Sequence, residues 1–247
     1  MEIVADLHTH TIVSGHAYGT IRENAKAAAE RGLKILGITE HAPGIPGTCQ
    51  DIYFSNLAVL PRELYGVQML YGSEVNVLND GTLSLEDKIL DKLDYAIAGI
   101  HTLCYHDEGK AKNTENLISC MKHEKVKLVS HPDDDHTPLD YERLVKAAKE
   151  YHVALEVNNS SLIKTDVRWN CQQNYKEMLR LCSLYRVPVV IDSDAHDPFY
   201  VGEFGRAIEF LRKEGFDQEL VINNDIKKVM DFLEFRVAGT ALPDMGI

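Results

Sequence analysis

Imidazole and carboxylate side chains recur in short clusters along this chain, and together they could hold metal ions. The sequence contains 11 histidines, and the first cluster, Asp6-Leu7-His8-Thr9-His10, places two of them two residues apart. In an extended segment such residues share one face, so His8 and His10 could chelate a single ion. Similar groups follow later in the chain: His16, Glu40, His41, Glu74, His101, His131, Glu156, Asp192, Asp194 and His196.

Each of these residues, taken alone, has a simpler explanation. A single histidine such as His101 is more often a hydrogen-bonded or surface residue, and an acidic pair such as Asp192 and Asp194 is more often solvated. Their shared context argues otherwise, because most follow a short apolar run. Polar groups are costly at the ends of buried strands unless something satisfies them. The combination therefore predicts a metal site.

The apolar runs have the pattern of parallel strands that are buried on both faces. Each run is short, several are rich in β-branched residues, and most lack polar alternation. Seven such runs occur, at residues 3–5, 34–38, 67–71, 95–99, 127–129, 153–157 and 187–191.

Amphipathic helices are predicted between most of these runs. Thr20 and Glu23 have the spacing of a capping box at the start of the first helix, and Gly32 is expected to end it. Asn79-Asp80-Gly81 predicts a tight turn. The helical patterns cover residues 21–31, 114–122, 140–151, 173–185 and 203–213.

Strands that alternate with helices predict an α/β protein with a parallel sheet. Seven strands favour a barrel, closed or incomplete, and no linker divides residues 1–247, so we expect a single domain. In an α/β barrel the residues that follow the strands share the C-terminal face, where active sites are built. The scattered histidines and carboxylates should therefore meet.

The composition excludes several function classes. No run of 18 or more apolar residues suggests a membrane span, and a net charge of -12 argues against broad binding to nucleic acid. Neither GxGxxG nor GxxxxGK[ST] occurs, which removes the main support for a nucleotide-binding fold. Residues 1–6 do not resemble a signal peptide, and the five cysteines lack CxxC spacing, so we expect a cytoplasmic protein with reduced thiols.

The clustered motifs resemble those of a known family. Four segments are similar to motifs of the PHP (polymerase and histidinol phosphatase) family: Asp6-Leu7-His8-Thr9-His10-Thr11, Ile38-Thr39-Glu40-His41, Ser130-His131-Pro132 and Ser193-Asp194-Ala195-His196. Others resemble its small stand-alone, YcdX-like phosphatase branch: His16-Ala17-Tyr18, Glu74-Val75-Asn76, Glu156-Val157-Asn158-Asn159-Ser160-Ser161 and Gly202-Glu203-Phe204. The resemblance covers nearly the whole chain. It implies a distorted, TIM-barrel-like (β/α)7 barrel with its metal site at the C-terminal ends of the strands.

The resemblance also implies three divalent metal ions, held by seven histidines and two carboxylates. One ion would be held by His8, His10, Glu74 and Asp194. A second would share Glu74 as a bridging ligand and add His101 and His131, and the third would be held by His16, His41 and His196. Such sites usually contain zinc, and the same ligand types also suit manganese or iron. The candidate catalytic residues are Glu74, Asp194 and His196.

Three divalent ions bring more positive charge than two carboxylates neutralise, which favours hydroxide and phosphate as further ligands. We therefore expect a metal-dependent hydrolase, a phosphatase that attacks a small phosphorylated metabolite with a metal-bridging hydroxide. Arg22, Lys164 and Arg168 are candidate phosphate contacts. Asp6 is expected to orient a ligand histidine.

Departures from the family pattern leave the substrate open. Glu40 stands where aspartate is common, Asp192 where a small residue is frequent, and residues 133–135 are three aspartates where neutral residues are expected. If those three face the site, they would favour small phosphomonoesters, for example ones that carry an amine. The alternatives are a histidinol-phosphate phosphatase, a nuclease, and a non-catalytic metal-dependent binding or regulatory protein. The oligomeric state is not predicted.

Overall fold

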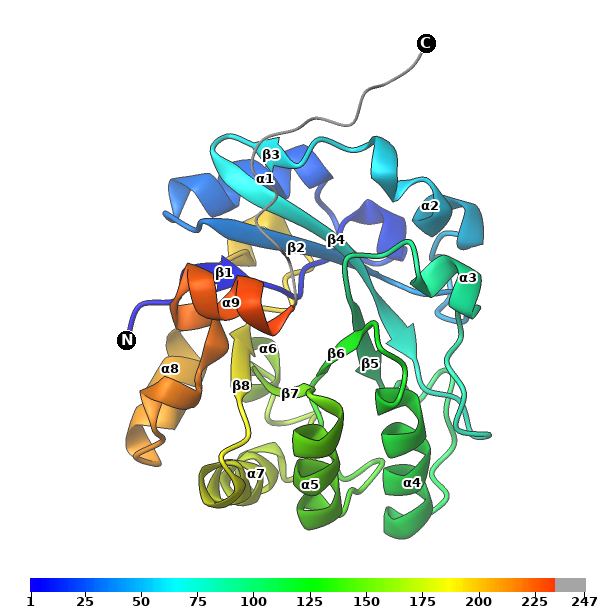
Figure 1. The fold of residues 1–247 in the computed structure, drawn as a ribbon, viewed down its shortest axis with the longest axis vertical. Helices are drawn as coiled ribbons and strands as arrows, with labels where there is room; N and C mark the ends of the chain where they lie inside the picture. The colour runs from blue at the N-terminus through cyan, green and yellow to red at the C-terminus, as the bar shows by residue number, and fades with distance from the viewer. Residues whose placement is uncertain (234–247) are drawn as a thin grey trace.

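The structure, a computed structural model, describes residues 1–233, and residues 234–247 of the predicted domain lie outside the described part. All seven apolar runs form parallel strands that are arranged as a barrel (Figure 1). The predicted (β/α)7 architecture is confirmed. In spatial order the strands are β1 (Ala5–Asp6), β2 (Ile35–His41), β4 (Val67–Asn76), β5 (Ala96–Gly99), β6 (Val126–Val129), β7 (Ala154–Asn158) and β8 (Val189–Asp192).

The barrel is joined between β8 and β1 by the side chain of Asn223, which lies in the 3-10 helix η5 (Ile222–Asn224). Its Nδ2 donates to the carbonyl oxygens of Ala5 at 2.9 Å and Ile191 at 2.5 Å, and its Oδ1 accepts from the Ile191 N–H at 3.1 Å. The Asn223 carbonyl also accepts from the Val4 N–H at 2.9 Å. Asn223 thus takes the place of strand pairing at one end of this seam. The other end is closed by a parallel bridge between Thr9 and Ala195, where the His10 N–H donates to the Ala195 carbonyl at 2.9 Å.

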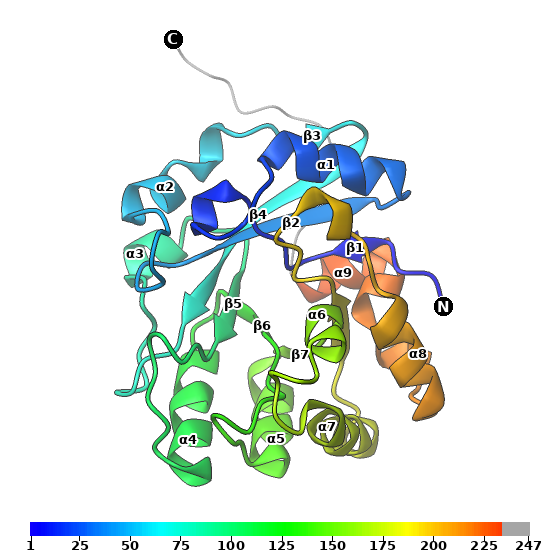
Figure 2. The ribbon, with the colours of Figure 1, turned by 180° about the vertical axis from the view of Figure 1, so that it is seen from behind.

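The predicted helices are present and cover the outside of the barrel. Helices α4, α5 and α7 pack side by side (Figure 2). The capping box of Thr20 and Glu23 is formed, and Gly32 follows α1 with φ +80°. The corresponding helices are α1 (Ile21–Glu30), α4 (Lys110–Met121), α5 (Tyr141–Tyr151), α7 (Cys171–Tyr185) and α8 (Gly205–Lys213).

Several short elements have no counterpart in the sequence prediction. They are α2 (Asp51–Ser55), β3 (Glu63–Leu64), α3 (Asp87–Leu90), α6 (Asn159–Ile163), α9 (Ile226–Phe232), and the 3-10 helices η1 (Ile12–Ser14), η2 (Leu57–Val59), η3 (Pro198–Tyr200) and η4 (Gln218–Leu220). Strand β3 pairs antiparallel with β4. No helix within residues 1–233 is long and apolar enough to cross a membrane.

The inner face of the barrel changes from apolar to polar along the strands. Buried apolar residues such as Leu70, Ile97 and Val190 pack with Val229 and Phe232 of α9. Because side chains alternate along a strand, Glu74 has the same orientation as Leu70, four residues earlier. The same spacing relates Ile97 to His101. The interior of the barrel is therefore filled by apolar side chains toward one end, and it is lined by polar side chains at the carboxyl ends of the strands.

Candidate metal centre

The predicted metal ligands converge at the carboxyl ends of the strands. Their side chains form three overlapping groups in which all ligand atoms lie within 4.8 Å of one another: His8, His10 and Asp194; His41, Glu74 and His101; and His10, His41 and His196. The sequence pattern thus brings together residues from both halves of the chain.

Four ligand atoms surround one point beside β1. The Nε2 atom of His8 lies 3.3 Å from Oε2 of Glu74 and 3.6 Å from Oδ1 of Asp194. The Nε2 atom of His10 lies 3.6 Å and 3.3 Å from the same two oxygens. Ligands about 2.0 Å from a tetrahedral metal ion lie about 3.3 Å apart. The spacing of these atoms therefore fits a divalent ion.

Glu74 faces two groups of histidines with its two oxygens. Oε2 lies toward His8 and His10, and it is also 2.8 Å from Nδ1 of His41. Oε1 lies 3.2 Å from Nε2 of His101 and 2.9 Å from Nε2 of His131. A carboxylate in this position can bridge two cations.

His16 and His196 form a third pair of ligand atoms. Their Nε2 atoms are 3.1 Å apart, while their Nδ1 atoms contact the backbone carbonyls of Ser14 at 3.1 Å and Asp194 at 3.0 Å. Because carbonyls only accept, each Nδ1 is assigned the proton and each Nε2 presents a lone pair. Two lone pairs that face each other need a cation between or beside them. The ring of His41 stacks on His16 with a centroid distance of 5.0 Å, so His41 adjoins both this pair and Glu74.

Four buried ligand atoms at this centre have no hydrogen-bond partner: His8 Nε2, His10 Nε2, His41 Nδ1 and Glu74 Oε2. The contact between His41 and Glu74, although short, does not have hydrogen-bond geometry. An unsatisfied buried polar atom costs about 1–3 kcal/mol. Four such atoms in one place fit divalent cations, which would accept their lone pairs.

Other side chains hold the ligand rings in orientation. Nδ1 of His8 is 2.7 Å from Oε1 of Glu156, whose Oε2 accepts the His131 N–H at 2.6 Å. Nδ1 of His10 is 3.0 Å from Oγ of Ser14, which in turn donates to Glu40 at 2.6 Å. Such partners direct the opposite ring nitrogen toward a metal. Glu40 is longer than the aspartate that is common at this position, and it acts on His10 through Ser14.

The prediction that Asp6 orients a ligand histidine is wrong. Asp6 accepts hydrogen bonds from the backbone and hydroxyl of Ser193, at 3.1 and 2.6 Å, and from the Gly202 N–H at 2.8 Å. It therefore fixes the loop after β8, while Glu156 contacts the histidine. Asp192 is also buried, and it accepts the Leu7 N–H at 2.7 Å.

The two carboxylates of this centre are held in the charged form that ligates metals. Burial opposes the charge of Glu74, but surrounding imidazoles, His101 foremost, hold the pKa of its carboxyl well below the usual range. The pKa of Asp194 is likewise lowered, against burial, mainly by His8. Burial lowers the pKa of His10 well below its usual value. Burial also opposes a charge on His8, but Glu156 and Glu74 raise the pKa of that imidazole well above its usual value. Because charged carboxylates and neutral imidazoles are the forms that ligate metals, a metal ion would displace a proton from His8.

Local backbone conformation allows the ligands to approach one another. His131 and Asp194 have φ values of +29° and +53°, which non-glycine residues rarely adopt. At Gly99 an added Cβ would lie 2.6 Å from Oγ of Ser130 and 2.9 Å from Oε1 of Glu74. Uncommon conformations of this kind often occur at functional sites.

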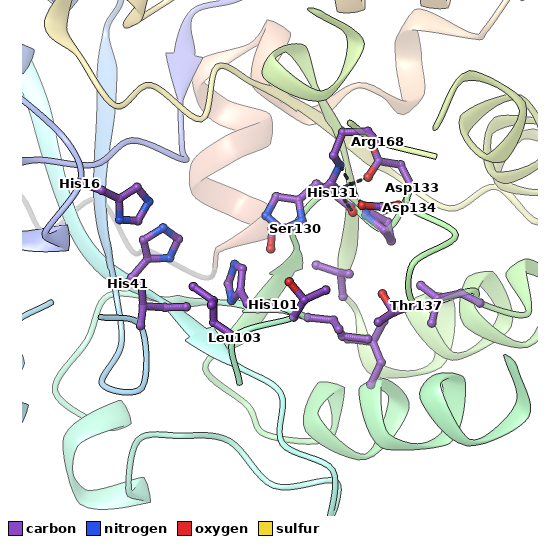
Figure 3. A pocket seen from close by; sticks show the side chains of 17 residues that line it. His16, His41, His101, Leu103, Ser130, His131, Asp133, Asp134, Thr137 and Arg168 are labelled. Carbon is purple, nitrogen blue, oxygen red and sulfur yellow. Dashed lines mark hydrogen bonds and ion pairs between the residues drawn. The ribbon is translucent and has the colours of Figure 1, made fainter. Parts of the chain in front are cut away.

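A cavity of about 340 Å3 opens above the ligands. Lys164 and Arg168, two of the three predicted phosphate contacts, line it together with His16, His41 and His131. An adjoining cavity of about 210 Å3 extends past His101 toward Thr137, as Figure 3 shows.

The prediction that Arg22 contacts phosphate is wrong. Arg22 is exposed on the outer helix α1 and does not line the cavity above the ligands.

The three aspartates at 133–135 mainly bind protein groups. Asp133 is buried and forms an ion pair with Arg168 (Figure 3). Asp133 and Asp134 line the adjoining cavity, whereas Asp135 lines neither of the two cavities. The other partners are Trp169 and His136 for Asp134, and Asn170 and Asn174 for Asp135. The suggestion that all three face a substrate is therefore not supported.

Sequence reasoning did not assign a role to some residues of this site. Ser130 donates to Oε1 of Glu74 at 2.6 Å, and Asn76 lies 2.8 Å from Nδ1 of His101. Asn76 shares a strand face with Glu74 at a spacing of two, so the sequence contained a signal for it. The contact of Ser14 with His10 depends on the turn at η1 and had no comparable signal.

Comparison with known proteins identifies a matching family and similar proteins from bacteria. The PHP domain model matches residues 6–160. The chain is 39% identical over 235 residues to a probable phosphatase of Clostridium botulinum, covering 95% of this chain and 96% of that protein. It is 42% identical, with the same coverage, to a probable phosphatase of Clostridium novyi.

Among solved structures, the fold resembles a histidinol phosphate phosphatase from Lactococcus lactis, solved with zinc, L-histidinol and phosphate. The TM-score is 0.60 at 17% identity, covering 86% of this chain and 94% of that chain. At this level of identity the similarity concerns the fold.

Proposed function

This chain belongs to the PHP domain family, and from that premise we propose that it is a metal-dependent phosphoesterase that hydrolyses a small phosphorylated substrate. One observation carries the proposal. Four buried ligand atoms without hydrogen-bond partners meet around Glu74, at the base of an open cavity. A purely structural histidine cluster would satisfy these atoms internally.

We further propose that the centre holds three divalent ions, with zinc as the first candidate and manganese or iron as alternatives. His8, His10, Glu74 and Asp194 would hold the first ion. Glu74, His101 and His131 would hold the second, and His16, His41 and His196 the third. The 2.8 Å approach of His41 to Glu74 makes His41 a second candidate link between ions.

Bound divalent ions supply Lewis acidity and lower the pKa of a coordinated water to about 7. The protein's own residues would position the phosphate above them. Arg168 is held by an ion pair with Asp133, and its Nη2 donates to the His131 carbonyl at 2.9 Å. Lys164 lines the same cavity, so the two cations would orient phosphate oxygens. Among the candidate catalytic residues, Asp194 and His196 line this cavity as well.

We also propose that residues 1–247 act as one domain in the cytoplasm. The net charge of -12 supports a small substrate over nucleic acid. The oligomeric state is left open.

An assay of substrate classes tests the proposed function. Metal-loaded protein should release phosphate from small phosphomonoesters faster than from phosphodiesters or single-stranded DNA, and a chelator should abolish the release. Histidinol phosphate belongs in the panel as a specific alternative. Preference for single-stranded DNA would favour a nuclease. Metal uptake without turnover of any substrate would favour a binding or regulatory protein.

A further inference from the structure

A third cavity, of about 270 Å3, opens beside the metal centre. Asp194 and His196 line both this cavity and the one above the ligands, and so does Lys164. Its remaining wall includes Tyr18, Ile163 and Tyr200. A ligand with one end over the metal ligands could therefore extend directly into it.

The wall of this third cavity exposes apolar surface. Tyr18 is 78% exposed, Ile163 53% and Tyr200 51%. Within residues 1–233 the Tyr18 side chain makes no hydrogen bond, ion pair or ring contact. Clustered exposed apolar side chains that line a concave surface commonly mark a binding site.

The backbone that carries these side chains is held in place. The Tyr18 N–H donates to the His196 carbonyl at 2.8 Å, which fixes the Tyr18 backbone beside His196. On the opposite wall, Arg31 donates to the Phe199 carbonyl at 2.6 Å and pairs with Glu203 at 3.2 Å. Exposed side chains on a fixed backbone are preorganised for a ligand, because the backbone does not have to become ordered on binding.

Two carboxylates that line the third cavity have protein partners. Glu203 is paired with Arg31, and Oδ1 of Asp197 accepts the Phe199 N–H at 2.9 Å. Lys164 makes no ion pair within the described residues, and it lies where the two cavities meet. A free cation at this junction suits the phosphate end of a ligand.

We propose that the third cavity binds an aromatic ring in the alcohol part of a phosphomonoester, with Tyr18 and Tyr200 as ring contacts. The inference rests on the proposed function for the position of the phosphate. Ligand pockets commonly have volumes of about 300–1,000 Å3, so a cavity near the lower limit suits a single ring better than a nucleotide. The cavity would thus select aromatic over aliphatic phosphomonoesters.

Binding of unreactive analogues tests this selection without turnover. Calorimetry of the metal-loaded full-length protein would compare phenylphosphonate with methylphosphonate. We expect at least tenfold tighter binding of phenylphosphonate. Tyr18→Ala and Tyr200→Ala should each reduce this ratio to below threefold, whereas Tyr18→Phe should retain it. The matched control is Tyr65→Ala, an exposed tyrosine between β3 and β4 that should leave the ratio unchanged.

The outcomes separate the two proposals. Equal affinity for both phosphonates, or a ratio that both alanine variants leave intact, would overturn the aromatic site. Parallel assays with phenyl phosphate and methyl phosphate test hydrolysis. If neither ester is hydrolysed while the affinity ratio holds, the proposed function fails and the aromatic site stands.

Discussion

Glu74 is the residue on which the proposed metal centre depends most. Its two oxygens face different groups of histidines, at 2.8–3.6 Å for Oε2 and 2.9–3.2 Å for Oε1. A bridging carboxylate offsets the repulsion between cations that typically lie roughly 3.5–4 Å apart. Neutralising this one side chain should therefore affect two metal positions together.

We predict that Glu74→Gln lowers both bound metal and turnover. The amide keeps the shape and removes the charge, so the fold should survive. Phosphate release should fall more than a hundredfold, which corresponds to about 2.7 kcal/mol of barrier. Metal analysis and a phosphate assay measure the two effects, with the exposed Glu63→Gln as control. Normal metal content and turnover in Glu74→Gln would refute the bridging role.

Glu156 should control metal affinity without touching a metal itself. It contacts the His8 ring and the His131 N–H with separate oxygens. In Glu156→Gln an NH2 group replaces one of the two oxygens. This donor would face either the His8 ring N–H or the His131 backbone N–H, which are donors themselves. Loss of such a partner typically weakens metal binding about 10–100-fold. Competition with a metal indicator would measure this change, and Glu150→Gln on the surface of α5 is the control. Unaltered affinity would mean that His8 does not need this partner.

The convergence of the proposed ligands could be predicted from the sequence, but their supporting contacts could be predicted only in part. Glu74 and Asp194 follow apolar runs, and a buried strand end leaves a polar group few alternatives to a functional role. Asp6 stands in an equally suggestive position, yet it binds Ser193 and Gly202. Which carboxylate meets a histidine depends on the barrel's side-chain directions, which sequence spacing does not specify.

Among the structural elements, the seam between β8 and β1 is the least regular part of the barrel. Asn223→Ala would remove three hydrogen bonds and leave buried groups of Ala5 and Ile191 without partners. At about 1–3 kcal/mol for each unsatisfied group, we predict a loss of at least about 3 kcal/mol in the free energy of unfolding. Urea denaturation measures it.

The neighbouring Asn224 provides the control for this prediction. Its Nδ2 donates at 2.9 Å to the Gln218 carbonyl at the surface, so Asn224→Ala should cost about 1 kcal/mol or less. Similar losses for the two variants would mean that the Asn223 amide does not hold the seam.

The seven parallel strands could be predicted because burial on both faces makes their sequences continuously apolar. Strand β3 has two residues and no such signal. Helix α9 was also missed, since its role depends on reaching the barrel interior, where Val229 and Phe232 pack. Short elements defined by distant contacts are not determined by local pattern.

For the whole molecule, metal binding and folding should be linked. Buried atoms without hydrogen-bond partners destabilise the metal-free fold, and a bound cation would satisfy them. These atoms belong to His8, His10, His41 and Glu74. With free metal about a hundredfold above its Kd, linkage adds about 2.7 kcal/mol to the free energy of unfolding. Thermal unfolding with and without a chelator should therefore show a lower Tm for the stripped protein. Identical Tm values would argue against ordered metal sites.

Metal titration tests most directly whether this barrel hydrolyses phosphomonoesters through a centre of several metal ions. Protein stripped with a chelator would be titrated with zinc, and separately with manganese, while phosphate release from phenyl phosphate and methyl phosphate is followed. We predict no release without metal and a plateau at two to three equivalents per chain. Release that persists in the stripped protein, a plateau below about one and a half equivalents, or no release at any loading would contradict it.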